Sequence, residues 1–409
     1  EDYKIVYSQR VQSNTIVKFR NLKQKRKQMK KMIKLSLVAA TAVAGLTTTA
    51  SATAMEDSIK NTDLSGYIRY RYTQEEGVTG ESNKYKTVFK VKSKINDNAS
   101  AFIKIAGENA TTDTTGDADP DQTAIKEAKF IIKAAGATVL AGKQGLQTPF
   151  AAISDDQGTG VVALYPVGPV TLAAGWYANS DARSNVYDVD LGGNNITAVA
   201  AIGAAGPVKY SVWYADVSED DLTLEADGVT ASALTGNTAG ATAINLNLAA
   251  KVGPASVEFN HAQVQYTVNK ADAVKTKQSR LVASVKAGPA TVTAGYVKTG
   301  NEGGDVTLGD TDATANFFLE NVSASTLADA SIYYVGAKAK VAMVKVGLEY
   351  LSGDGKLSNG DTAANINALA KTDASELKLS VAYAMSKNFT ISGFMTNSET
   401  ETSGVKTEG

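Results

Sequence analysis

The segment Lys84-Tyr85-Lys86-Thr87-Val88-Phe89-Lys90-Val91-Lys92-Ser93-Lys94-Ile95 decides the fold class, because its charged and apolar side chains alternate. Lysines occupy even positions, whereas Tyr85, Phe89, Val91 and Ile95 occupy odd ones. A helix would scatter these lysines around its axis, but a strand places them all on one face. A charge facing lipid costs about 2–4 kcal/mol near the bilayer midplane, so the lysine face has to meet water. The segment therefore predicts a strand with one wet face and one apolar face.

Charged residues alternate with apolar ones in further segments, at 64–72, 124–134, 341–351 and 375–385. Tyr and Trp often lie near the segment ends, as in the interfacial girdles of membrane barrels. We predict that the charged faces line a water-filled pore. The predicted pore-lining residues are Arg69, Arg71, Lys86, Lys90, Lys92, Lys94, Lys104, Glu127, Lys129, Lys133, Lys345 and Glu349.

Gly-Pro pairs separate neighbouring segments at four places, 168–169, 206–207, 253–254 and 288–289. The linkers on the far side of the segments are long and polar: Ala178–Asn195, Asp216–Gly240, Thr267–Gln278 and Gly300–Leu327. Short turns that alternate with long loops are typical of up-and-down β-barrels. The sequence thus predicts an all-β, transmembrane, antiparallel up-and-down barrel.

Seventeen strands can be counted in the sequence. They are Leu64–Tyr72, Lys84–Ile95, Ser100–Glu108, Ala124–Ala134, Ala137–Gln144, Gly160–Tyr165, Val170–Ala178, Ile196–Gly203, Val208–Ala215, Ala243–Val252, Ala255–Tyr266, Ser279–Ala287, Ala290–Thr299, Ala330–Lys338, Val341–Leu351, Ser375–Met385 and Phe389–Ser398. Bacterial single-chain barrels usually close with an even number of strands, so we expect residues 64–409 to form a barrel that lacks its last strand. Residues after Ser398 are then expected to lie in a long loop. In Ala255–Tyr266 the apolar parity switches, for which we expect a β-bulge near Asn260–His261.

The N-terminal region is basic and reads as an export signal. Residues 1–52 hold 11 of the 41 Lys and Arg residues and 2 of the 42 acidic ones, which leaves residues 53–409 a net charge of about −10. Lysines 30, 31 and 34 precede the uncharged run Leu35–Leu46, and the segment ends in Ala50-Ser51-Ala52. We predict a secretory signal peptide over 29–52, cleaved after Ala52 or after Ala54, followed by a short acidic segment, 53–63. Residues 1–28 are interpreted as untranslated leader or as a disordered basic extension.

The connection Gln144–Gly158 differs from the other long linkers in being partly apolar. We expect it to fold inward and narrow the pore through Gln144, Thr148, Phe150, Asp155 and Asp156, with Asp155 and Asp156 facing the basic wall; the alternative is an exposed Asp-Asp turn. Opposed charges across a pore orient solutes and bias ion selectivity.

Catalysis has little support in this sequence. There is no cysteine and a single histidine, His261, which is not accompanied by a nucleophile motif. A moderately acidic body without a basic patch also argues against nucleic acid as a partner. No enzyme activity is predicted.

The segment 50–72, ASATAMEDSIKNTDLSGYIRYRY, resembles the start of the Campylobacter-type major outer membrane porins, in which a short acidic segment leads into a D-[VL]-S-G-x-[IL]-R-Y-R-Y first strand. Ala141-Gly142-Lys143-Gln144 and the following Thr-Pro-Phe and Asp-Asp resemble that family's strand end and inward loop. The resemblance implies an 18-stranded, homotrimeric, cation-preferring diffusion porin in the outer membrane. It also implies a structural calcium ion at Asp155 or Asp156, contact with outer-membrane lipids and lipopolysaccharide, and insertion by the barrel-assembly machinery.

The function predicted is therefore a general-diffusion porin for ions and small hydrophilic solutes. A non-conducting surface barrel that acts as an adhesin is the alternative. A soluble β-solenoid would need a fixed repeat, but the Gly-Pro pairs are 38, 47 and 35 residues apart. A barrel enzyme would depend on His261 alone.

Overall fold

The computed structural model describes residues 60–74, 81–112, 122–151, 156–181, 183–184, 189–190, 193–221, 238–268, 271–309, 313–357, 371–402 and 405–408. Within these ranges the protein is an antiparallel β-structure with one short 3-10 turn, η1 (Ala324–Thr326). No helix of these ranges has the length and apolar character needed to cross a bilayer. The predicted signal peptide and leader lie outside the described residues.

One large sheet contains nearly all the strands. These are β1 (Thr62–Gln74), β2 (Glu81–Asn96), β3 (Ala99–Thr112), β4 (Gln122–Ala134), β5 (Ala137–Gly145), β6 (Gln157–Val167), β7 (Val170–Ser180), β10 (Ile196–Ala205), β11 (Val208–Asp221), β12 (Thr238–Val252), β13 (Ala255–Val268), β14 (Ala271–Ala287), β15 (Ala290–Thr299), β16 (Leu327–Val341), β17 (Val344–Leu357), β18 (Lys371–Ser386), β19 (Phe389–Thr402) and β20 (Val405–Glu408). The two-residue strands β8 (Arg183–Ser184) and β9 (Val189–Asp190) pair with each other.

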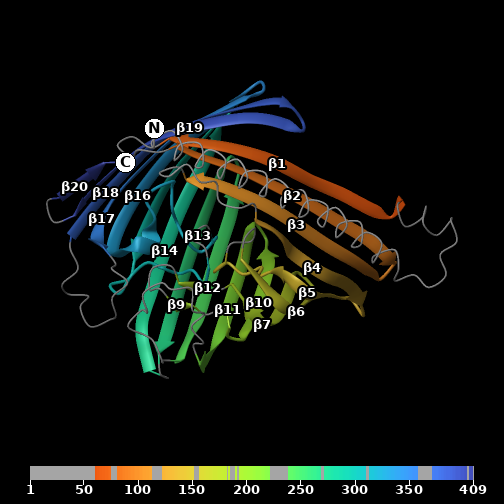
Figure 1. Ribbon diagram of the computed structural model, residues 1–409. Coiled ribbons are helices and arrows are strands. Elements are labelled where there is room, and N and C mark those ends of the chain that lie inside the picture. Colours follow the sequence, from red (N-terminus) through yellow and green to blue (C-terminus); the bar gives the residue numbers. More distant parts are fainter. Residues whose placement is uncertain are drawn as a thin grey trace, which may run out of the picture.

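Each strand of the large sheet pairs antiparallel with its neighbours in the chain, and β7 pairs with β10. The sheet curls around an interior, so that the orange first strands and the dark blue last strands come to the same side of the molecule (Figure 1). All seventeen predicted strands are present. The predicted barrel is confirmed, because a regular up-and-down order with a period of two leaves one face for lipid and one for the interior.

Two predictions about the loops are wrong. Val405–Glu408 forms β20 and pairs with Glu399–Thr402 of β19, although we expected a long loop after Ser398. The expected loop Thr267–Gln278 is almost absent, because β13 continues to Val268 and β14 begins at Ala271. In both places the strand pairing continues through polar residues, so the hairpin extends beyond the apolar band.

The Gly-Pro pairs form the short turns, as predicted. Gly168, Gly206, Gly253 and Gly288 have φ of 58° or 59°, and proline follows each of them. A positive φ at the first turn position is what a type II′ hairpin turn requires, and the φ of about −65° that proline imposes fits the second position. The twist of such a turn suits the flanking strands. Short turns gathered at one end leave the long connections at the other, as in outer-membrane barrels.

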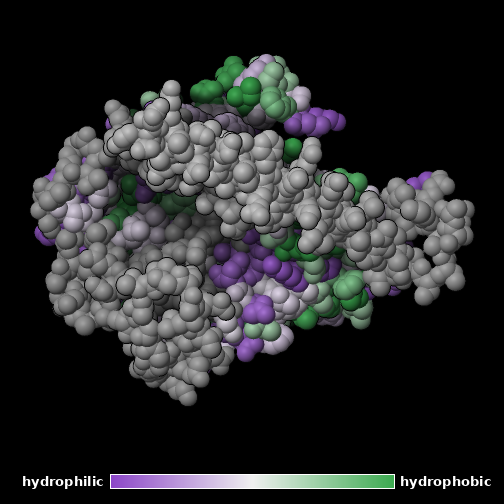
Figure 2. Space-filling model, in the orientation of Figure 1, coloured by the Kyte–Doolittle hydropathy of each residue, from purple (hydrophilic) through white to green (hydrophobic). Residues whose placement is uncertain are grey.

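The two faces of the sheet differ in character. The outward face carries large apolar side chains that are exposed, such as Ile68, Val212 and Leu348, with relative exposures of 79%, 50% and 52%. In Figure 2, hydrophilic residues gather beside the hollow in the middle of the view and hydrophobic residues lie towards the outer edges. The outward face therefore has the composition that a lipid-facing surface requires.

The expected bulge in β13 is wrong. The register between β12 and β13 is continuous through Asn260 and His261, and the pairing with β14 shifts only between Tyr266 and Thr267. Ala262, Val264 and Tyr266 are buried on the inward face, in the same cluster as Val306 and Leu308. The inward face becomes apolar here because chain packs against it inside the barrel, not because the strand turns over.

Candidate pore site

The inward face of β1 to β4 is a basic wall. Lys104 and Lys129 approach the carboxylate of Glu127, with Nζ–O distances of 3.8 and 2.5 Å, and both are largely buried with it. Lys129 also lies 5.1 Å above the centre of the Phe102 ring. One carboxylate therefore pairs with two ammonium groups, and this part of the wall keeps a net positive charge.

The other predicted pore-lining residues lie on the same inward face. Lys86 and Lys90 are inward by their pairing with Arg69 and Lys104, and Arg71 follows Arg69 at the same parity. Lys90, Lys92, Lys104, Glu127 and Lys129 surround a cavity of about 670 Å³. Across the barrel, Glu349 is buried and its carboxylate lies 2.8 Å from Lys338 Nζ.

The connection after β5 lies inside the barrel. Gln144 and Phe150 have no exposed surface, and Thr148 is also buried. Phe150 packs in a cluster with Leu146, Tyr177 and residues of β10 to β13. Tyr177 donates its hydroxyl hydrogen to the carbonyl oxygen of Leu146 at 3.1 Å. The apolar residues that set this connection apart in the sequence are the ones that anchor it to the wall.

The described residues of a second connection, 300–309 and 313–326 between β15 and β16, also lie inside the barrel, and sequence reasoning missed them. Val306, Leu308 and Ala315 are buried in the cluster that holds Phe150. Their backbone joins the first connection, because the N–H of Leu308 donates to Phe150 O at 2.6 Å and that of Ala315 to Pro149 O at 2.8 Å. The apolar run Phe317-Phe318-Leu319 in an otherwise polar linker was the available signal.

The described parts of the two connections, residues 145–151 and 156 in the first and 300–309 and 313–326 in the second, are named the inner loops. Their exposed residues Gln147 and Thr314 border two cavities, the basic one already described and a second of about 540 Å³. Gln147 has a φ of 52°, a left-handed conformation that is rare for non-glycine residues. The inner loops therefore leave space on both of their sides, towards β1 to β4 and towards β11 to β14.

The wall of the second cavity is polar but electrically balanced. Asn245 Nδ2 donates to Asn260 Oδ1 at 3.1 Å, and Asn247 Nδ2 donates to Glu258 Oε1 at 3.0 Å. The same oxygen of Glu258 accepts from Arg280 Nη2 at 3.0 Å. The interior thus has a basic side at β2 to β4 and an amide-rich, charge-paired side at β11 to β14.

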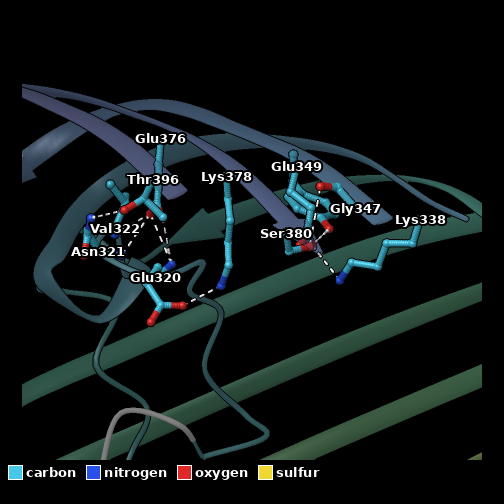
Figure 3. Close-up of polar contacts among 11 residues, drawn as sticks. Glu320, Asn321, Val322, Lys338, Gly347, Glu349, Glu376, Lys378, Ser380 and Thr396 are labelled. Atoms are coloured by element: carbon cyan, nitrogen blue, oxygen red, sulfur yellow. Dashed lines mark hydrogen bonds and ion pairs between the residues drawn. The ribbon is translucent and has the colours of Figure 1, made fainter. Parts of the chain in front are cut away.

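A buried carboxylate holds the second inner loop to β18. Glu376 has no exposed surface, and its oxygens accept the backbone N–H groups of Glu320, Asn321 and Val322 at 2.9–3.2 Å. Lys378, also on β18, reaches Glu320 with an Nζ–Oε2 distance of 2.5 Å. Figure 3 shows Glu376 and Lys378 pointing from the sheet towards the same bend of the loop. Because three orphan donors meet one carboxylate, this bend has a defined position on the wall.

Comparison with known proteins agrees with this architecture. The sequence profile described as Campylobacter major outer membrane protein matches residues 29–409. The chain belongs to this family. The predicted resemblance is confirmed, and the family and the fold locate the chain in the outer membrane as a multi-pass β-barrel. No curated protein sequence matches the chain significantly.

Solved structures similar to this family member are outer-membrane barrels of distant sequence. The outer membrane protein OpdK of Pseudomonas aeruginosa aligns with a TM-score of 0.60 at 11% identity, over 85% of this chain and 95% of OpdK. Acinetobacter baumannii OccAB4 gives 0.58 at 13% identity, over 85% and 94%. P. aeruginosa OccD3 gives 0.56 at 14% identity, over 85% and 88%. At these identities the likeness concerns the fold.

The calcium ion implied by the resemblance needs several oxygen ligands. Asp155 lies outside the described residues. Asp156 is 4% exposed, and its carboxylate lies so close to Gly309 that a Cβ there would come within 2.0 Å of Oδ2. In the described part of the chain, no three acidic or histidine side chains gather where they could hold a metal ion. Calcium at Asp155 or Asp156 therefore stays a prediction.

Proposed function

We propose that this outer-membrane barrel is a general-diffusion porin, which passes ions and small hydrophilic solutes through an interior narrowed by the two inner loops. The observation that carries the proposal is the pair of cavities, about 540 and 670 Å³, that border Gln147 and Thr314. Charged and amide side chains line both cavities, and such surfaces are stable beside water but not in a sealed apolar core. Family membership supports the same role.

Ion selectivity follows from how charge is distributed around this passage. The basic side of β2 to β4 attracts anions, whereas the acidic inner loops and the net negative body attract cations. We propose a mild cation preference with a field across the passage, so that a dipolar solute is oriented between the loops and Lys90, Lys104 and Lys129. The homotrimer, lipopolysaccharide contact and insertion by the barrel-assembly machinery remain predictions of the family resemblance.

Planar bilayer recording with the purified protein tests the proposal. We expect stable single-channel steps in potassium chloride, and a small reversal potential of the sign for cations under a salt gradient. A non-conducting adhesin would give no steps at all, which would refute the porin. Steps with a reversal potential of the opposite sign would refute the cation preference alone.

A further inference from the structure

Lysines gather on the inward face at the end of the barrel where the short turns lie. Eight two-residue turns lie at this end: the four Gly-Pro turns and the turns at 97–98, 135–136, 342–343 and 387–388. Within three residues of these turns there are eight lysines and one acidic residue, Asp97. Those that lie on strands and face inward are named the turn-side lysines. They are Lys94, Lys133, Lys209, Lys251, Lys286, Lys340 and Lys345.

Their inward direction follows from the register. Lys251 lies opposite Ser256, Ser256 opposite Ser284, and Lys286 opposite Thr291. This row has the same parity as Asn260 and Arg280, which line the second cavity. The lysines are exposed, so their ammonium groups reach the water at this mouth of the barrel.

These charges are almost uncompensated. Lys94 lies 2.6 Å from Asp97. Among the described residues, the other six turn-side lysines have no carboxylate within ion-pair distance. Six like charges around one opening create a potential that draws multivalent anions, and the low-dielectric wall focuses it.

One part of this mouth is formed as a pocket. A cavity of about 410 Å³ lies between the turns Gly253-Pro254 and Gly288-Pro289, and it is lined by Lys251, Lys286, Ser256, Ser284 and Thr291. Two ammonium groups and three hydroxyl groups are donors of the kind that bind phosphate oxygens. The hydroxyls of Ser284 and Thr293 lie 2.9 Å apart and fix each other's position.

The opposite mouth has the reverse charge. Apart from the inner loops, the connections between strand ends on that side (75–80, 113–121, 181–195, 222–237, 269–270 and 358–370) contain twelve Asp or Glu residues and two Lys or Arg residues in the sequence. In outer-membrane barrels the short turns face the periplasm and the long loops face outward. Charge is therefore separated along the barrel axis: acidic residues lie at the outer, long-loop end, and lysines lie at the periplasmic, short-turn end.

We propose that the turn-side lysines form a binding site for soluble multivalent anions, phosphate-bearing ones above all, which is reached from the periplasmic mouth. The pocket of Lys251 and Lys286 is its best-formed part. Lipid phosphates are excluded as ligands because these side chains face the interior. The site is distinct from the passage beside the inner loops, and its axial field makes anion binding depend on the side of addition.

Side-specific block of single channels tests the proposal, with inorganic tripolyphosphate as the probe. The chain has no cysteine, so Asn388→Cys in the turn before β19, labelled with an impermeant maleimide, reports which side the turns face. We expect tripolyphosphate to reduce the current at concentrations at least about tenfold lower from the turn side than from the loop side. Lys251→Gln with Lys286→Gln should raise the half-blocking concentration about tenfold.

The matched control is Lys356→Gln with Lys371→Gln, a cross-strand lysine pair at the loop-side ends of β17 and β18. It removes the same charge, and we expect it to leave block from the turn side unchanged. Equal block from both sides, or no effect of the double variant, would overturn the proposal. If the protein forms no channels, the porin is refuted, and calorimetric titration of the detergent-solubilised protein with tripolyphosphate then decides the anion site: heat lost in the Lys251/Lys286 variant supports it, and unchanged heat overturns it.

Discussion

Replacing Glu376 by alanine should release the second inner loop from the wall. The substitution leaves the N–H groups of Glu320, Asn321 and Val322 without their carboxylate, which now accepts them at 2.9–3.2 Å. A hydrogen bond to a charged group contributes about 1.5–3 kcal/mol, and water in the lumen can replace part of it, so we expect a loss of about 3–5 kcal/mol. Because 1.4 kcal/mol is a factor of about ten, the undocked population rises roughly a hundredfold or more.

Single-channel recording measures this change as open-channel noise and subconductance steps, which should increase in Glu376→Ala. The matched control is Glu349→Gln, which also removes an inward carboxylate but bonds only to the wall residues Lys338 and Tyr334. A second readout is a cysteine at Ser325, which is fully buried, and whose reaction with a methanethiosulfonate should speed up as the loop undocks. Noise and modification rate equal to those of the parent protein would refute the reasoning.

Three further changes test other parts of the structure. Phe150→Ala removes a fully buried ring from the core shared by the inner loops, and should cost about 3–5 kcal/mol, seen as a lower unfolding temperature in detergent; unchanged stability would contradict the packing. Glu127→Gln leaves Lys104 and Lys129 without their carboxylate, so the ratio of anion to cation permeability should rise about twofold, measured as a reversal potential; a shift towards cations would contradict the assignment of this wall to the passage. In Gly253→Ala the new Cβ meets no other atom, but the backbone φ is 59°. The substitution should lower the free energy of unfolding by about 1–2 kcal/mol and slow refolding into detergent. Gly193→Ala is its control, because Gly193 also has open space around it and has no positive φ; an equal effect of both substitutions would contradict the turn argument.

The strands and their facing were predictable because the signal is local. In β2, the lysines alternate with Tyr85, Phe89 and Val91, and a bilayer imposes the same rule on every strand, residue by residue. The Gly-Pro turns were predictable for the same reason, since a positive φ followed by proline is satisfied within two residues. The inward connection after β5 could be anticipated because Phe150 and Leu146 are apolar where a solvated loop would be polar.

The predictions that were wrong concern residues whose contacts lie far away in the chain. The parity of β13 looked interrupted because Val264 and Tyr266 meet Val306 and Leu308, some forty residues later. The loop 300–326 looked solvated because its polar groups are satisfied by distant partners, such as Glu376 for Val322. A linear sequence has no periodicity that records such pairings.

The sequence by itself thus determined the barrel, the lipid face and the position of the Gly-Pro turns, because each depends on residue type at regular spacing. Only the tertiary structure decided that two loops, not one, occupy the interior, that Glu376 anchors the second, and that Lys251 and Lys286 share one pocket. Those outcomes depend on which distant segments meet when the sheet curls, and that is set by the closure and stagger of the whole barrel.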